Sequence, residues 1–405
     1  MRIVYAYLYF FLFCSPLYSM NTQPDSVAFP PISKEVQISL ITGEPGKELY
    51  TSFGHSAVRV YDPITGIDLV YNYGTFDFDA PGFYSNFLKG RLNYSLSVYD
   101  FNRMAFAYRY FNQSLYEQVL NLSYNEEKAV YDFLNVNYQP ENRYYPYDFF
   151  FDNCSSRIRD VFQNILGAKL VFNDDHIKKH KTFRQLLDEF LYVNPWGDFG
   201  IDLILGLPAD DTVTSEEYMF LPYKLYDAFD NAVIDWNKEE IPFVKATHVI
   251  HQSVKMPGDR KISITPRILF WSLFIIILGL SLILPEKKVI LKILDIFLFL
   301  SVGLAGFIIA FLWFGTDHYA TKDNLNLLWA FPTHLFLVYL IIRDFRSVWI
   351  RYYHLFWMFF LILFLGSWTL LPQQLNLANI PIILMLIVRF YFNYKKLNAY
   401  VERRT

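Results

Sequence analysis

The stretch FDNCSSRIRD, residues 151–160, places Cys154 at the start of a predicted helix. Apolar residues then recur at the spacing of one helical face, at Ile158, Val161, Phe162, Ile165 and Leu166. Asn153 is the expected N-cap. Cys154 then lies in the first turn, where free backbone N–H groups and the helix dipole favour a thiolate, and Arg157 and Arg159 add positive charge. The pattern favours a reactive thiol over a structural one.

The other cysteine, Cys14, lies in an apolar N-terminal stretch. Residues 1–19 begin with one basic residue, Arg2, followed by an apolar run and by small residues, which is the layout of a secretory signal. Without the signal, Cys154 has no cysteine partner within the chain. It is then an inert core residue, the partner of an intermolecular disulfide, or a nucleophile.

Five apolar stretches follow Arg267, each roughly twenty residues long, which is the length that crosses a bilayer. They are 268–284, 289–314, 325–342, 349–371 and 375–392. Basic residues gather in the loops on one side of them, at Lys287, Lys288, Lys292, Arg343, Arg346, Arg351, Lys395, Lys396, Arg403 and Arg404, whereas the opposite loops hold only Lys322. Because basic loops stay in the cytoplasm, we expect a cytoplasmic C-terminus. The predicted parts are a signal at 1–19, an extracytoplasmic domain at 20–266 and a membrane domain at 267–405.

The predicted extracytoplasmic domain mixes strands and helices. Extended patterns cover 36–42, 56–61, 68–73 and 90–98, a helical pattern covers 123–135, and an extended segment at 144–151 leads into the cysteine helix. This order indicates an α+β domain. His55 follows Gly54 at the start of the second strand. Since imidazole serves a thiol as base and acid near neutral pH, His55 is the expected partner of Cys154.

Several motifs together resemble one family of membrane enzymes. They are SFGH at 52–55, VYNYGTF at 70–76, NCSSRIRD at 153–160, FLP at 220–222, and Asp317-His318 followed by Asn324, Asn326, Leu327, Leu328 and Trp329. Over nearly its whole length the chain resembles the Lnb-type bacterial lipoprotein N-acyltransferases. A histidine strand ahead of an Asn-Cys helix is also the order of circularly permuted papain-like enzymes, NlpC-type wall peptidases among them. The resemblance implies a permuted papain-like domain followed by a membrane domain of five transmembrane helices.

The resemblance also implies a reaction in the bacterial cytoplasmic membrane. The cysteine takes an acyl chain from a phospholipid and passes it to the α-amine of the diacylglyceryl-cysteine of a lipoprotein. In permuted papain-like folds a polar group on the strand after the histidine orients the imidazole, which points to Asn72. Tyr71 and Tyr73 would face the other side of that strand. No cofactor is implied, and the net charge of −3 gives no reason to expect a nucleic-acid partner.

Four further residues are candidates for contacts with substrate. Asn153 and Ser155 flank the nucleophile and are candidates for binding an oxyanion, although an N-cap already has its side chain engaged. Asp317 and His318 lie in the loop 315–328, at headgroup depth, where a phospholipid ester and a lipoprotein amine would meet the thiol. The other interpretation of this loop is a solvated connector.

Two other functions stay open. A membrane-tethered cysteine peptidase or amidase acting on cell-wall peptides would use the same Cys154–His55 pair, but only residues 239–266 separate the domain from the first apolar stretch, which limits its reach. A non-catalytic membrane scaffold would bury the thiol passively. No metal site is predicted, because His248 and His251 lack further ligands at useful spacing, and no Gly-rich phosphate loop occurs.

Overall fold

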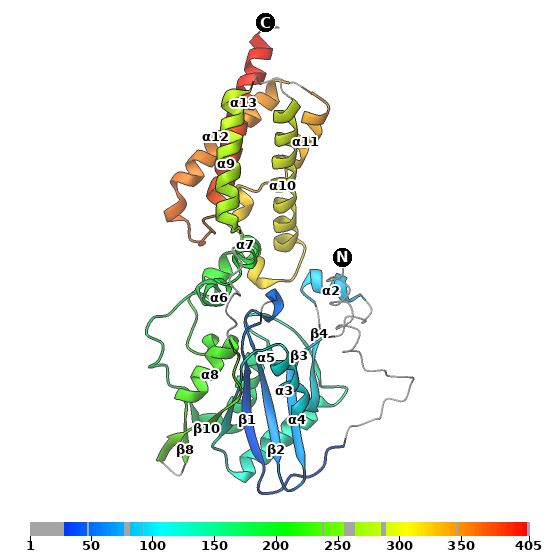
Figure 1. Cartoon of the computed structure of the whole chain (residues 1–405), viewed down its shortest axis with the longest axis vertical. Coiled ribbons are helices and arrows are strands. Elements are labelled where there is room, and N and C mark those ends of the chain that lie inside the picture. Colours follow the sequence, from blue (N-terminus) through cyan, green and yellow to red (C-terminus); the bar gives the residue numbers. More distant parts are fainter. Residues whose placement is uncertain are drawn as a thin grey trace.

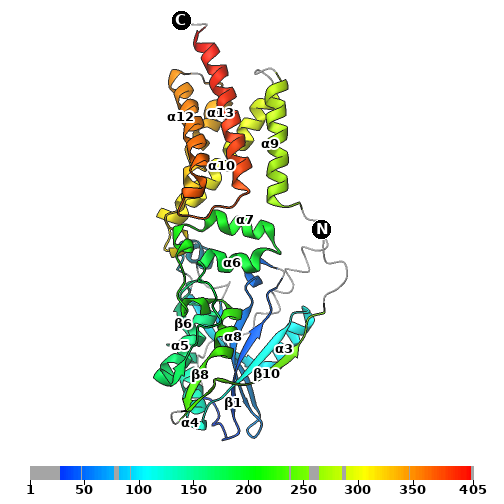
Figure 2. The same cartoon turned by 90° about the vertical axis from the view of Figure 1, so that its left-hand side faces the viewer.

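The protein is described by a computed structural model over residues 28–46, 48–76, 82–91, 93–236, 239–254, 264–284, 289–345 and 347–402. The predicted signal at 1–19 lies outside these residues, as do Lys287, Lys288, Arg346, Arg403 and Arg404. A sheet-containing part and a helical part are stacked along the long axis of the molecule (Figure 1). The turned view shows α6 (Phe183–Leu191) and α7 (Pro195–Ile204) between the two parts (Figure 2).

Within the described residues, seven antiparallel strands form the main sheet, in the order β10-β5-β1-β2-β3-β4-β6. Their bounds are β1 Gln37–Gly43, β2 His55–Asp62, β3 Ile67–Thr75, β4 Asn93–Asp100, β5 Leu115–Leu120, β6 Tyr144–Pro146 and β10 Val244–His251. The strands predicted at 36–42, 56–61, 68–73 and 90–98 are therefore confirmed as β1 to β4. A smaller sheet joins β7 Leu170–Val171, β8 Val233–Trp236 and β9 Glu239–Pro242.

Helices cover both faces of the main sheet. They are α3 Phe101–Tyr110, α4 Tyr124–Tyr138, α5 Cys154–Leu166 and α8 Pro222–Asn231. Helix α2 Phe83–Lys89 lies beyond the end of the strands, on the side of the helical part (Figure 1). Val58 of β2 packs in one core with Ile158 of α5 and Leu134 of α4, whereas its neighbour Ala57 packs under α3 on the opposite face. Because side chains alternate along a strand, a slip of one residue would exchange these two cores, so the register of β2 is strongly specified.

The two helices predicted in this domain are confirmed as α4 and α5, and the predicted cap Asn153 is confirmed for α5. Ser123 caps α4 in a capping box with Glu126, which satisfies backbone N–H groups that the first turn leaves unpaired. Asn153 caps α5, and the helix ends at Gly167 with a positive φ of 57°. The nucleophile candidate therefore stands at the first residue of a well-capped helix.

The helical part contains five described helices that run alternately toward and away from the sheet (Figure 1). They are α9 Pro266–Ile283, α10 Val289–Phe314, α11 His334–Ile342, α12 Val348–Gly366 and α13 Asn379–Glu402. Among the described residues, α9, α10 and α12 are long and apolar enough to cross a membrane. The end of α13 lies far from the sheet, on the same side as the last residues of α9 and α11 (Figures 1 and 2).

The prediction of one continuous span at 325–342 is wrong. Only His334–Ile342 is α-helical, and nine residues at 1.5 Å each reach about 14 Å, less than half of a bilayer core of about 30 Å. The side chains of Asn324 and Asn326 explain the break, since both donate hydrogen bonds to backbone carbonyls of α7. Trp329 is 2% exposed and donates to Asn326 Oδ1 at 3.0 Å, so it is a core residue and not an anchor at the bilayer surface.

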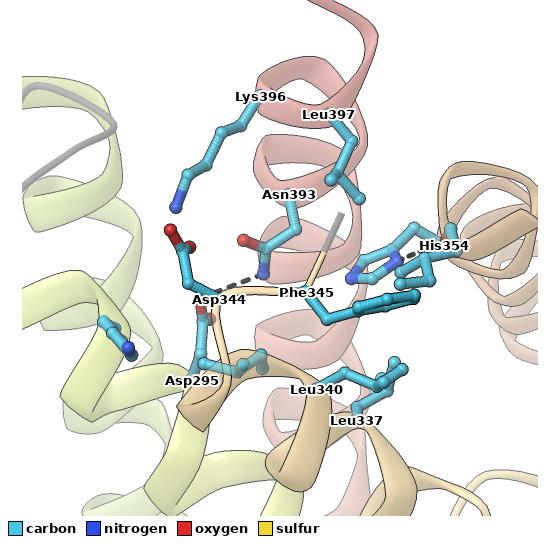
Figure 3. Close-up of a pocket in the computed structure, with 12 residues that line it drawn as sticks. Asp295, Leu337, Leu340, Asp344, Phe345, His354, Asn393, Lys396 and Leu397 are labelled. Atoms are coloured by element: carbon cyan, nitrogen blue, oxygen red, sulfur yellow. Dashed lines mark hydrogen bonds between the residues drawn. The ribbon is translucent and has the colours of Figure 1, made fainter. Parts of the chain in front are cut away.

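A buried ion pair joins three of the membrane helices. Arg389 of α13 donates to the Asp295 carboxylate of α10 at 2.6 and 3.0 Å and to Ser281 Oγ of α9 at 2.7 Å. Asn393 donates to the same carboxylate at 3.0 Å. Figure 3 shows Asp295 and Asn393 in a small polar pocket, whose lining also includes His354, Asp344 and Lys396. Because an unpaired charge among apolar helices is costly, the pair holds α9, α10 and α13 together.

Candidate active site

The position of Cys154 is set by the cap of α5. Asn153 Oδ1 accepts hydrogen bonds from the backbone N–H groups of Ser155 at 2.8 Å and Ser156 at 3.0 Å. Its Nδ2 donates to two backbone carbonyls at 2.8 and 2.9 Å. Both ends of the buried Asn153 amide are therefore hydrogen-bonded, and the side chain acts as the N-cap of α5.

His55 and Asn72 meet from neighbouring strands, β2 and β3. His55 Nε2 lies 2.6 Å from Asn72 Oδ1, and Asn72 Nδ2 donates to the Tyr99 hydroxyl at 3.2 Å. Because an amide oxygen only accepts, Nε2 carries the proton and Nδ1 keeps a lone pair. Cys154 is the other partner of the imidazole, through electrostatic attraction and a side-chain hydrogen bond, and Nδ1 is the ring nitrogen left available for it. The three side chains thus lie in one connected row, with the imidazole in the tautomer that accepts a thiol proton.

The residues around Asn72 in β3 follow the predicted alternation. Tyr71 and Tyr73 point to the opposite face of the sheet, where their hydroxyls donate to side chains of α4. Gly74 has a φ of +120° at a bulge between β3 and β4. A Cβ on Gly74 would lie 3.5 Å from His55 Cε1 and 3.6 Å from Cys154 Cβ. The bulge therefore brings bare backbone against both members of the pair, in a conformation that favours glycine.

The electrostatics of the pair favour a thiolate and an imidazolium. Burial by itself raises the pKa of the Cys154 thiol and lowers the pKa of His55. Their mutual attraction and hydrogen bond outweigh burial, so the pKa of Cys154 is lowered and the pKa of His55 is raised. The Ser56 backbone N–H also donates to the sulfur, and the Asn72 amide stabilises the imidazolium. This is the charge state of an activated thiol nucleophile.

Arg157 and Arg159 do not supply the positive charge that was expected beside the thiol. Arg157 pairs with Asp152 at 2.6 Å, and Arg159 pairs with Asp160 at 2.7 Å. Both guanidinium charges are therefore neutralised by carboxylates next to them. The cation that lowers the thiol pKa is His55, which comes from a distant strand.

Ser155 lies fully buried beneath the nucleophile. Its Oγ is 3.2 Å from Ser56 Oγ and 3.9 Å from Cys154 Sγ. These contacts connect the first turn of α5 with the start of β2. Ser155 therefore helps to hold the thiol against the strand that carries His55.

Asp317 and His318 are placed beside α2 and not beside the thiol. The Asp317 carboxylate pairs with Arg91, and its backbone N–H donates to Lys89 O at 2.8 Å. His318 Nε2 lies 3.1 Å from Phe87 O. The loop after α10 is thereby fastened to α2 and to the residues that follow it.

One residue later, the same loop contacts the segment that leads into α5. The ring of Tyr319 lies 5.6 Å from the ring of Phe151, measured between centroids. Phe151 is three residues ahead of Cys154. The thiol therefore stands at the end of the sheet-containing part that faces the membrane helices.

A polar junction at α6 and α7 was missed from the sequence. Ligand atoms of Asp188, Asp198 and Asp202 lie within 4.8 Å of one another, beside a groove of about 620 Å³, and burial with the neighbouring carboxylates raises the pKa of Asp188 to about 7. Buried Arg184 pairs with Asp202 at 2.7 Å, and Asn376 donates to Asp198 and Asp202 at 3.0 and 2.9 Å. These ion pairs and hydrogen bonds indicate that the acidic cluster is a structural contact between the sheet-containing part and the helical part. The i, i+4 spacing of Asp198 and Asp202 was the available signal.

Comparison with known families matches both parts of the chain. A family model of the Lnb N-terminal periplasmic domain matches residues 32–189, and a model of the Lnb transmembrane domain matches residues 258–399. No curated protein and no solved structure matches the chain. The sheet-containing part is thus a periplasmic domain and the helical part a membrane domain, as in an inner-membrane protein. With both domains matched in order, the chain has the architecture of the Lnb-type lipoprotein N-acyltransferases and belongs to that family.

Proposed function

We propose that this protein is a cysteine-dependent acyltransferase that moves an acyl chain from a phospholipid to the N-terminal amine of a diacylglyceryl-cysteine lipoprotein. The observation that carries the proposal is the row of Cys154, His55 and Asn72 at the end of the periplasmic domain that faces the membrane helices. Both substrates reside in the outer leaflet of the same membrane. A thiol held beside that leaflet meets them at high effective concentration.

In the first half-reaction the Cys154 thiolate attacks the ester carbonyl of the phospholipid. A carbon–sulfur bond forms, the ester carbon–oxygen bond breaks, and the His55 imidazolium gives its proton to the departing alcohol oxygen. The products are an acyl-cysteine thioester and a lysophospholipid. Asn72 holds the imidazole in place through the bond from Nε2.

In the second half-reaction the lipoprotein amine attacks the thioester. An amide bond forms, the carbon–sulfur bond breaks, and the amine proton returns the Cys154–His55 pair to its starting charge state. For the oxyanion of both steps we propose the backbone N–H of Cys154 as donor, because Asn153 already accepts from the next two N–H groups. Asn153 and Ser155 then act by fixing the geometry of that first turn.

The domain organisation belongs to the same proposal. Residues 1–19 serve as the export signal, 20–266 form the periplasmic catalytic domain with a permuted papain-like fold, and 267–405 form the membrane domain. The order of His55 on β2 before Cys154 on α5 supports this fold. The alternating direction of α9 to α13 supports five crossings, with α11 and the polar turn before it making the short third one, and a cytoplasmic C-terminus.

Intact-mass analysis tests the reaction. The purified protein is incubated with phosphatidylethanolamine in nanodiscs, and we expect a mass gain of one acyl chain on Cys154. A synthetic diacylglyceryl-cysteine peptide should then remove that acyl chain and become N-acylated. Cys154→Ala and His55→Ala should abolish both steps, whereas Thr75→Val, on the same strand as Asn72, should leave them intact.

Two results would contradict the proposed reaction. An unmodified Cys154 in the presence of phospholipid, combined with cleavage of cell-wall peptides, would replace the acyltransferase with a cysteine peptidase. Normal transfer by Cys154→Ala would return the thiol to a passive role in a scaffold.

We also propose that Asp317 and His318 position the entrance to the site. Their contacts to Arg91 and to the backbone of α2 hold the loop 315–328 in place. His318→Ala is expected to slow acyl-Cys154 formation at unchanged protein abundance. Wild-type rates for both half-reactions in this variant would make the loop a connector.

A further inference from the structure

Helix α2 presents large apolar side chains to its surroundings. Tyr84 is 71% exposed, Phe87 52% and Leu88 53%, although the helix has only seven residues. Both ends are closed by glycines with positive φ, Gly82 and Gly90, so the segment is a compact turn of helix between two sharp bends. Apolar patches of this kind are costly in water and mark a surface that something covers.

The membrane domain fixes the level at which α2 lies. The last residue of α10 is Phe314, which is 72% exposed. Three residues later, Asp317 binds Lys89 O through its backbone N–H and Arg91 through its carboxylate, and His318 binds Phe87 O. Helix α2 therefore lies beside the end of α10 that is nearer to the sheet (Figure 1).

A row of aromatic rings runs inward from α2. Phe87 stacks on Phe83 at 6.3 Å, Phe83 stacks on Phe76 at 5.9 Å, and Phe76 contacts Tyr94 at 5.1 Å, measured between ring centroids. Tyr94 in turn stacks on Tyr147 at 4.0 Å.

The inner end of this row lies beside the nucleophile. Tyr94, Tyr147 and Cys154 all pack against the same hydrophobic core of the periplasmic domain. The charge of Cys154 acts on both tyrosines, and burial followed by that charge raises the pKa of Tyr94 to about 12. The inner end of the row is thus formed by two stacked aromatic rings in the core against which Cys154 also packs.

We propose that α2 is inserted in the outer leaflet and that the aromatic row from Phe87 to Tyr147 binds the acyl chain of the phospholipid donor on its way to Cys154. The bilayer is the partner that covers Tyr84, Phe87 and Leu88. Apolar rings pack against a hydrocarbon chain without leaving polar groups unpaired, and a chain held on them is kept out of water. The location of α2 stands on its own, whereas the role of the row rests on the proposed acyl transfer.

Depth-dependent quenching tests the location of α2. In a chain with Cys14→Ser and Cys154→Ser, Phe87→Cys is labelled with an environment-sensitive fluorophore and reconstituted in nanodiscs that contain nitroxide-labelled lipids. We expect strong quenching by nitroxides placed high on the acyl chain. Ile64→Cys is the control, because this exposed residue lies in the turn at the far end of β2 from His55. Equal quenching at the two positions would overturn the proposal.

The rate of acyl-Cys154 formation tests the row. Phe87→Ser and Phe83→Ala should lower the rate with a long-chain phospholipid about tenfold more than the rate with a short-chain, water-soluble ester, because only the long chain occupies the row. Ile64→Ser should change neither rate. An equal loss on both esters, or no loss on either, would overturn the row as a binding site. If wild-type Cys154 accepts no acyl group from either ester, the proposed function fails, while the quenching result still decides where α2 lies.

Discussion

Removal of the Asn72 amide should slow the reaction without unfolding the protein. In Asn72→Ala the His55 Nε2–H loses its acceptor at 2.6 Å, and the bond that stabilises the imidazolium is gone. A hydrogen bond to a charged group contributes about 1.5–3 kcal/mol. Since about 1.4 kcal/mol corresponds to a tenfold change in rate, we expect acyl-Cys154 formation to fall about 10- to 150-fold. The loss should appear in the rate constant, because Asn72 contacts the base and not the phospholipid.

The assay is the single-turnover rate of acyl-enzyme formation, followed by intact mass at saturating phospholipid. Asn72→Asp keeps an oxygen acceptor, so it should retain far more activity than Asn72→Ala. The added negative charge should also raise the pKa of His55 further and move the optimum to higher pH. Thr75→Val is the matched control, because it removes one side-chain hydrogen bond, to Ser97, from the same strand without touching the pair.

Two results would refute this reasoning. A wild-type rate in Asn72→Ala would mean that the imidazole is positioned by the fold alone. A loss of the same size in Thr75→Val would mean that the reaction depends on the general structure at the end of β3, and that the hydrogen bond from Asn72 to His55 has no special role.

Three further predictions follow from the charges of the molecule. Burial by itself raises the pKa of Cys154, but the attraction of His55 outweighs burial and lowers it. Alkylation by iodoacetamide should therefore persist below the ordinary thiol pKa of 9.0, and His55→Ala should move the alkylation midpoint upward. Identical pH profiles for the two proteins would contradict the ion pair. Arg389→Ala should lower the free energy of unfolding by about 3–5 kcal/mol, because it leaves Asp295 without its counter-ion. Replacing both residues with leucine should recover most of the melting temperature. Equal melting temperatures of the two variants would mean that the ion pair does not hold these helices together. A reporter fused after Thr405 should be cytoplasmic, and protection of that site from cytoplasmic reagents would refute the alternating topology.

The sequence by itself determined the features that depend on near neighbours. Asn153 before Cys154, and an apolar face repeating behind it, predict a capped helix because both are set within a few residues. Gly54 and His55 at the start of an alternating segment likewise predict β2. The apolar lengths of α9, α10 and α12 were visible because a span is set by its own composition.

The tertiary structure decided which distant residues meet. Only the register of β2 on β3 places His55 next to Asn72, and only the packing of α5 on the sheet brings both to the thiol. The break at 325–342 escaped prediction because Asn324 bonds to α7, more than a hundred residues earlier.

The same physical reason explains the other differences. The position of Arg157 in the sequence predicted a positive charge near the thiol, but its ion pair with Asp152 neutralises that charge. The ring row from Phe87 to Tyr147 has no periodicity, since α2, the residue after β3, β4 and the segment before α5 each contribute one or two rings. Periodicity reports which face of an element is buried, and it carries no information about the element that buries it.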